Sequence, residues 1–141
     1  MKLTKFETIY GQVPSKANGY MVVPDNAGGK RIIKGNEIRE YERNFMRQCS
    51  IYAGRQILGR FRLLVTVYEC SNHYDLDNAL KTILDCLQYA KAISNDNLCT
   101  EIAARKVVDA RNPRIVYAIE EVDAPLELFD ISELNKPKRR V

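Results

Sequence analysis

The spacing of apolar residues changes along the chain, and these changes separate predicted strands from predicted helices. In the N-terminal part, short apolar runs between turn-forming residues predict a strand over 6–12 and a small hairpin with strands near 20–23 and 31–33. Over residues 37 to about 58, apolar residues recur at steps of three and four. This spacing predicts a helix, with Asn36 as its N-cap.

The C-terminal half contains one strong strand, one strong helix and two weaker strands. The nearly continuous apolar run at 61–68 predicts a well-buried central strand. Apolar residues at helical spacing predict a helix over 75–90, and the segments 101–108 and 114–119 predict two strands that form a hairpin. This order of elements predicts an α+β fold, in which a mixed, mostly antiparallel sheet packs as one layer against two main helices.

Length and charge divide the chain into one domain and a tail. The 141 residues suffice for a single domain with its own core, and we assign this domain to residues 1–124. Residues 125–141 combine an acidic segment with a basic end, which predicts a flexible tail. No apolar run reaches the roughly 20 residues that span a bilayer, and the N-terminus has no apolar signal region. We therefore expect a cytoplasmic protein without membrane contacts.

Cysteine usage argues against a structural metal centre of the zinc type. The four cysteines contain no C-x-x-C pair, and His73 is the only histidine in the sequence. In a cytosolic protein such cysteines are expected to be free thiols that behave as small apolar side chains.

Basic side chains are concentrated between residues 30 and 62, where nine lysines and arginines accompany three glutamates. Within the predicted helix, Arg39, Arg43 and Arg47 advance by four residues and therefore share one face. Such a face is suited to the phosphate backbone of a nucleic acid. A helix face that is simply solvated has the same pattern, so charge alone leaves both interpretations open.

The candidate chemistry lies at the start of the helix predicted over 75–90. Asp75 and Asp77 are two residues apart, Lys81 follows one turn later, and Asp96 lies in the polar loop after the helix. Carboxylates suit a hard divalent cation such as Mg²⁺, and a cation beside a lysine in a basic protein suggests chemistry on phosphates. A structural interpretation remains open as well: Asp75 as N-cap, with an ion pair between Asp77 and Lys81.

These residues form part of a longer motif. The sequence reads Asp75-Leu76-Asp77-Asn78, then Lys81, Asp85 and Leu87, and finally Asn95-Asp96. It resembles the RusA family of Holliday junction resolvases, which carries D-L-D-N-x-x-K-x-x-x-D-x-L followed by a second acidic site, usually D-D. A weaker similarity lies upstream, where residues 13–18 look like an early P-x-x-x-N loop of that family.

The resemblance implies a Mg²⁺-dependent endodeoxyribonuclease, with Mn²⁺ as a possible substitute, that resolves four-way DNA junctions by paired phosphodiester hydrolysis. It implies a homodimer without a small-molecule cofactor, acting in DNA recombination and repair, of a kind commonly encoded by phages or prophages. The implied metal ligands are Asp75, Asp77 and Asp96, with Lys81 as the catalytic lysine and Asp85 in support. The basic residues expected to hold DNA are Lys16, Lys30, Arg31, Arg39, Arg43 and Arg47.

Two positions depart from the family pattern. Asn95 stands where the first acid of the D-D pair is usual, and Tyr74 precedes the motif where a basic residue can occur. Neither departure removes an implied ligand, but both change the local charge. Two alternatives remain: a metal-dependent nuclease that prefers flaps or forks, and a non-catalytic DNA-binding module whose acids only cap a helix.

Overall fold

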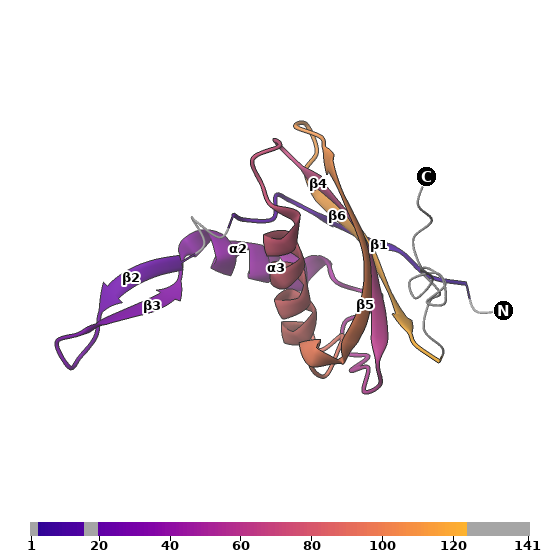
Figure 1. The fold of residues 1–141 in the computed structure, drawn as a ribbon, viewed down its shortest axis with the longest axis horizontal. Coiled ribbons are helices and arrows are strands. Elements are labelled where there is room, and N and C mark those ends of the chain that lie inside the picture. The colour runs from indigo at the N-terminus through magenta and orange to yellow at the C-terminus, as the bar shows by residue number, and fades with distance from the viewer. Residues whose placement is uncertain (1–2, 16–19, 124–141) are drawn as a thin grey trace, which may run out of the picture.

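The structure, a computed structural model, describes residues 3–15 and 20–123, and the predicted tail at 125–141 lies outside them. Four of the strands form one sheet and two form a separate hairpin (Figure 1). The elements are β1 (Glu7–Tyr10), β2 (Tyr20–Pro24), β3 (Lys30–Lys34), α2 (Asn36–Gln48), β4 (Phe61–Glu69), α3 (Leu76–Tyr89), the 3₁₀ turn η1 (Asp96–Leu98), β5 (Cys99–Val108) and β6 (Arg114–Glu121).

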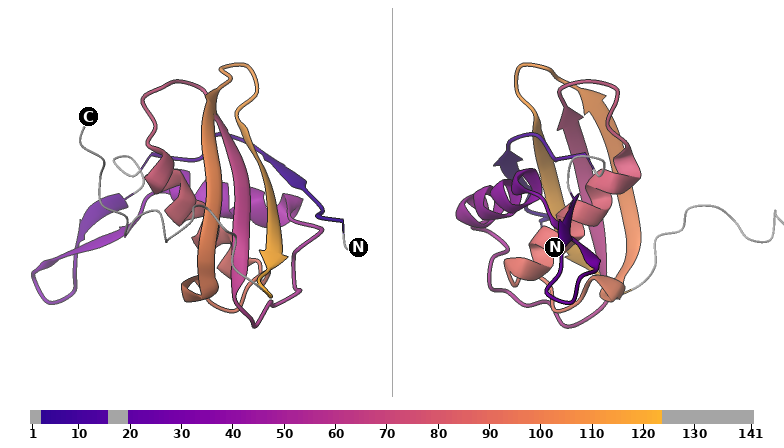
Figure 2. Two further views of the ribbon diagram at one scale, coloured as in Figure 1. Left: turned by 45° about the vertical axis from the view of Figure 1, so that its right-hand side comes forward. Right: turned by 90° about the vertical axis from the view of Figure 1, so that its left-hand side faces the viewer.

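The main sheet has the order β1-β6-β4-β5 (Figure 2, left view). β4 pairs with β6 in the antiparallel sense and with β5 in the parallel sense, so the sheet is mixed and mostly antiparallel. The predicted α+β fold and the central position of β4 are confirmed. The predicted hairpin of β5 and β6 is wrong, because β4 lies between these two strands.

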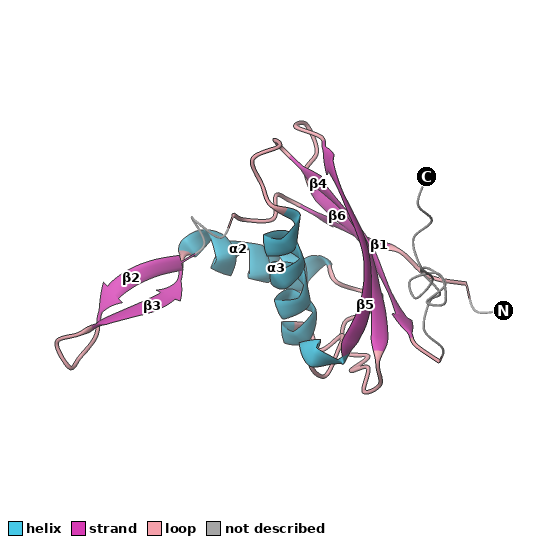
Figure 3. Cartoon of the chain, in the orientation of Figure 1, coloured by secondary structure: helices cyan, strands magenta, loops and turns pink. Residues whose placement is uncertain are grey.

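Both helices cover the same face of the sheet, which makes the domain two layers thick (Figures 1 and 3). Alternate residues of β4, from Phe61 to Val67, point into this interface and are almost fully buried. They pack with the inward residues of β6, such as Tyr117, and with Phe45 of α2 and Ile83 of α3. This core fixes α3, and thereby the candidate site, relative to the sheet.

Helix α2 is shorter than its apolar spacing predicts. It begins after Gly35 as N-cap instead of Asn36, and it ends at Gln48 instead of continuing to about residue 58. Beyond the helix, the carboxylate of Glu7 accepts hydrogen bonds from the backbone N–H groups of Ser50 and Ile51. These donors are therefore satisfied by a distant strand, and the chain leaves the helical path.

The predicted hairpin near the N-terminus is confirmed. β2 and β3 pair along their whole length and project beyond the start of α2, away from the main sheet (Figure 1). The carboxylate of Asp25 accepts hydrogen bonds from the N–H groups of Ala27 and Gly29 and so closes the turn. Gly28 adopts a φ of 82°, a conformation that favours glycine.

Two further predictions concerned the state of the cysteines and membrane-spanning segments. All four cysteines are free thiols, as predicted; Cys49 and Cys86 are buried, and Cys70 and Cys99 are half-buried. In the part of the chain that the structure describes, no helix has the length and apolar character needed to cross a membrane.

Candidate active site

The candidate site is built on the crossover from β4 through α3 to β5. Parallel neighbours require such a crossover, and here α3 supplies it. β4 ends at Glu69, a short loop follows, and α3 begins immediately after Asp75. The first acidic residues of the motif therefore lie beside the carboxyl end of the central strand.

Asp75 occupies the N-cap position of α3, but its side chain makes no capping hydrogen bond. Its nearest polar partner is the side-chain amide of Asn78, whose Nδ2 lies 3.5 Å from Asp75 Oδ2. Asp77 lies in the first turn, where its Oδ1 accepts the N–H of Asn78 at 2.9 Å. Both aspartates are exposed. The carboxylate of Asp75 is thus left available for a ligand.

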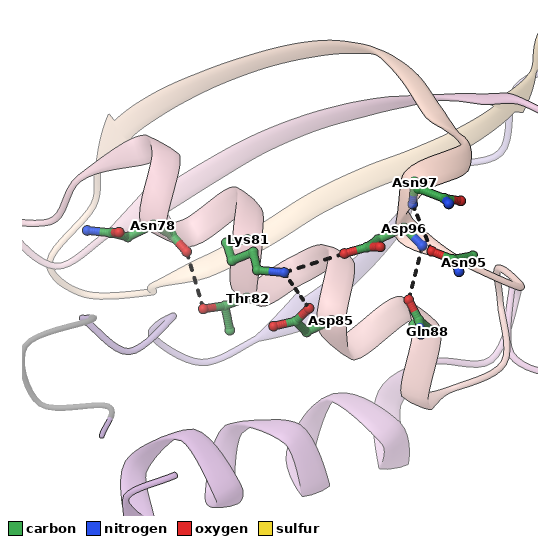
Figure 4. Close-up of polar contacts among 8 residues, drawn as sticks. All are labelled: Asn78, Lys81, Thr82, Asp85, Gln88, Asn95, Asp96 and Asn97. Carbon is green, nitrogen blue, oxygen red and sulfur yellow. Dashed lines mark hydrogen bonds and ion pairs between the residues drawn. The ribbon is translucent and has the colours of Figure 1, made fainter. Parts of the chain in front are cut away.

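Lys81 contacts two other carboxylates of the motif. Its Nζ lies 3.2 Å from Asp85 Oδ1 and 3.4 Å from Asp96 Oδ2 (Figure 4). Among the described residues these are the ion pairs of Lys81, and the alternative pair with Asp77 is not formed. The hydrogen bond and charge of Asp85, followed by those of Asp96, raise the pKa of Lys81. The ammonium group is therefore held charged.

Asp96 is brought to Lys81 by the turn η1, which it opens. Its backbone N–H donates to Oε1 of Gln88 at 3.0 Å, which ties η1 to the last turn of α3 (Figure 4). Asn95 caps η1, because its Oδ1 accepts the N–H of Asn97 at 3.0 Å. Asn95, one of the two departures from the family pattern, thus has a local structural role.

The three predicted metal ligands are spread along α3. β5 lies beside β4, but the parallel register places its first residue, Cys99, next to Phe61 and far from Glu69. Asp96 therefore meets α3 at Lys81, about 9 Å along the helix axis from Asp75 at 1.5 Å per residue. Within residues 3–15 and 20–123, no three acidic, cysteine or histidine side chains are grouped to hold a metal ion.

Two adjoining cavities open beside the start of α3. The smaller has a volume of about 120 Å³ and is lined by residues that include Glu69, Asp75 and Asn78. The larger, of about 480 Å³, extends along α2 as far as Arg47. Tyr74 lines both, so the second departure from the family pattern forms a wall of the site.

Glu69 is a site residue that the sequence reasoning missed. It is 0% exposed, and among the described residues neither of its carboxylate oxygens has a hydrogen-bond partner. Burial raises its pKa; the charge of Lys106 opposes this effect and that of Asp75 adds to it. The available signal was an acid in register with the inward apolar residues of β4.

The predicted DNA-binding residues lie on two elements. Arg39, Arg43 and Arg47 are exposed along α2, and Lys30 and Arg31 are exposed on β3. Lys16 lies outside the described residues. Of this set, Arg47 also lines the larger cavity, which connects the basic helix to the acidic end of α3.

Comparison with known protein families gives a match that covers most of the chain. The family model described as endodeoxyribonuclease RusA matches residues 14–120, which is most of the chain and contains the whole crossover. The match places the protein in the class of nucleases that hydrolyse phosphodiester bonds within DNA. The chain belongs to the RusA endodeoxyribonuclease family. No curated protein matches its sequence significantly.

Proposed function

We propose that this protein is a divalent-cation-dependent endonuclease that resolves four-way DNA junctions as a homodimer. The family supports endonuclease action on DNA, and the substrate, the cation and the dimer are our proposals. The observation that carries the proposal is Asp75, which holds the N-cap position without capping the helix. A residue present only to stabilise α3 would accept a backbone hydrogen bond there.

The oxygen donors near the start of α3 suit Mg²⁺, with Mn²⁺ as a substitute. Mg²⁺ is commonly held by one or two carboxylates, several waters and the phosphates of the substrate, so a closed protein cage is not required. Asp75 and Asp77 would hold it at this end of the helix, whereas the third predicted ligand, Asp96, pairs with Lys81 and is not grouped with them. The bound cation would supply charge neutralisation at the phosphate and a more acidic water.

Lys81 would stabilise negative charge on the reacting phosphate. Its ammonium is held between Asp85 and Asp96, on the helix that begins with Asp75 and Asp77. Asp85 would act as a positioning residue, since its contact is with Lys81. A fixed positive charge at the position where negative charge develops is a major source of rate enhancement.

The basic residues on α2 and β3 would hold the DNA backbone. The larger cavity runs from Arg47 to Tyr74 at the site, and Glu37 and Glu40 also line it, so the backbone contacts would come from the exposed arginines of α2 outside the cavity. Contacts of this kind position DNA without reading its sequence. A four-way junction presents two equivalent strands, and a two-fold dimer would present one site to each.

The test compares wild-type protein with Asp77→Asn on a four-way junction, a flap, a fork and plain duplex, with Mg²⁺. We expect wild type to cut the junction in symmetric strands, and Asp77→Asn to bind the junction but not to cut it. Equal cleavage by both proteins would refute a role for Asp77. A preference of wild type for flaps or forks would refute the junction assignment, and binding without cleavage by wild type would indicate a non-catalytic module.

A further inference from the structure

The buried carboxylate at the end of β4 stands out among the acidic groups of the core. Glu69 is 0% exposed, in register with the inward apolar side chains of the strand. Neither of its oxygens has a hydrogen-bond partner within the described part of the chain. Buried carboxylates are normally paired or hydrogen-bonded, so an exception calls for a physical explanation.

The positive charge that acts on Glu69 does not provide that explanation. Lys106 lies on the neighbouring strand and affects Glu69 electrostatically. Its Nζ, however, donates to the backbone oxygen of Tyr74 at 3.0 Å. The ammonium group thus ties the loop before α3 to the sheet, and the oxygens of Glu69 are left without a contact.

Glu69 also shares a cavity with an acid of the motif. It lines the cavity of about 120 Å³ together with Asp75, and the charge of Asp75 acts on it. A water molecule takes up about 30 Å³ in the liquid, so the cavity has room for a cation with a few waters. Two carboxylates that repel each other across such a space favour a cation between them.

We propose that Glu69 and Asp75 together bind a divalent cation in this cavity. Asn78 also lines the cavity, and its side-chain Nδ2 donates to Asp75 Oδ2 at 3.5 Å. The inference deepens the proposed nuclease function and rests on it for the role of the cation, but it concerns binding in the absence of DNA. Glu69 then becomes a metal-binding residue that the family motif at 75–96 does not contain.

The test measures Mn²⁺ binding to the DNA-free full chain by calorimetry and by the electron paramagnetic resonance of free Mn²⁺. The variant is Glu69→Gln, which keeps the shape of the side chain and removes its charge. Altering a residue that merely orients a metal ligand weakens binding by about 10–100-fold, so we expect Kd to rise at least about tenfold. Asp75→Asn should weaken binding to a similar degree.

A matched control is Glu7→Gln, the same change at another buried glutamate in the core. It should leave the Kd for Mn²⁺ unchanged. Thermal unfolding with and without Mg²⁺ provides a second measurement, in which Glu69→Gln should reduce the Mg²⁺-induced rise in Tm without lowering the metal-free Tm. Glu69→Asp, which keeps the charge on a shorter side chain, should bind more tightly than Glu69→Gln.

Three results would overturn the inference: no Mn²⁺ binding by wild type without DNA, equal Kd values for wild type and Glu69→Gln, or a lower metal-free Tm with unchanged Kd. The last would show that Glu69 is structural. Junction cleavage measured on the same preparations separates the two proposals. If wild type cuts the junction and Glu69→Gln binds Mn²⁺ as tightly as wild type, this inference is refuted and the nuclease proposal stands. If Mn²⁺ binding depends on Glu69 but wild type does not cut the junction, the nuclease proposal is refuted and this inference stands.

Discussion

Two buried glutamates on the helix-covered face of the sheet show how differently this protein treats an internal charge. Glu7 on β1 accepts hydrogen bonds from Tyr117 OH at 2.6 Å, from Ser50 Oγ at 2.9 Å and from two backbone N–H groups. Glu69 on β4 accepts none from the described residues. Burial alone would raise the pKa of Glu7, but these hydrogen bonds lower it; burial raises that of Glu69.

We attribute the difference to a structural role for Glu7 and to the cation-binding role proposed for Glu69. Burying an unpaired charge costs several kcal/mol, and hydrogen bonds to that charge offset much of this cost. Around Glu7 the protein itself supplies these hydrogen bonds. Around Glu69 and Asp75 the protein supplies little, which fits a site completed by a ligand from solvent. Loss of stability in one region and loss of activity in the other should therefore be separable by mutation.

The largest expected effect lies in the candidate active site, at Lys81. Lys81→Met should slow junction cleavage by about 10²–10³-fold, the loss typical of removing one preorganised charge-stabilising group. Stability should fall by no more than about 0.5 kcal/mol, because Lys81 is 66% exposed and its ion pairs are screened. Single-turnover cleavage and urea denaturation measure the two quantities. Lys5→Met, at an exposed lysine outside the site, is the control and should change neither.

The next effect lies around Glu7, where a substitution should change stability and leave activity unaltered. Glu7→Gln should lower the free energy of unfolding by about 2 kcal/mol, since hydrogen bonds to a charged group contribute about 1.5–3 kcal/mol. Cleavage under conditions where the variant is folded should keep its wild-type rate. A variant as stable as wild type near neutral pH would break the comparison between the two glutamates.

The smallest effect is the pH dependence of the stability difference between wild type and Glu7→Gln. Because hydrogen bonds lower the pKa of Glu7 below its ordinary 4.5 in the folded state, its contribution is complete above that value and is lost as pH falls through the folded pKa. Tyr117 and Cys49, the other titratable groups in contact, have raised pKa values and stay protonated. The stability difference between wild type and Glu7→Gln should thus shrink below pH 4.5. A constant difference would contradict this.

Much of the fold follows from local sequence patterns, and the errors have nonlocal causes. The apolar spacing predicts β4 and α3 almost to the residue, because their buried faces are long and regular. The end of α2 could not be predicted this way, since Glu7 captures the N–H groups of residues 50 and 51 from 43 and 44 positions away. The position of β4 between β5 and β6 is likewise a property of the sheet and not of either segment.

In the candidate site too, features set by contacts between distant parts of the chain could not be predicted from the sequence. The ion pair considered from the sequence, Asp77 with Lys81, is not the one formed, because Lys81 pairs with Asp85 and Asp96. Motif spacing does not predict that β5 runs parallel to β4, which separates Asp96 from Asp75 along the helix. Nor does it identify Glu69, whose importance comes from burial without a partner, a property that exists only after folding.

The most direct test of the central claim uses Asp75→Asn. Asparagine is as good an N-cap as aspartate, so a residue that only capped α3 would tolerate the change in both stability and activity. We predict a stability within about 0.5 kcal/mol of wild type, as for surface changes in general, together with loss of Mg²⁺-dependent cleavage of a four-way junction. Cleavage at the wild-type rate by a fully folded Asp75→Asn protein would contradict the assignment of this site.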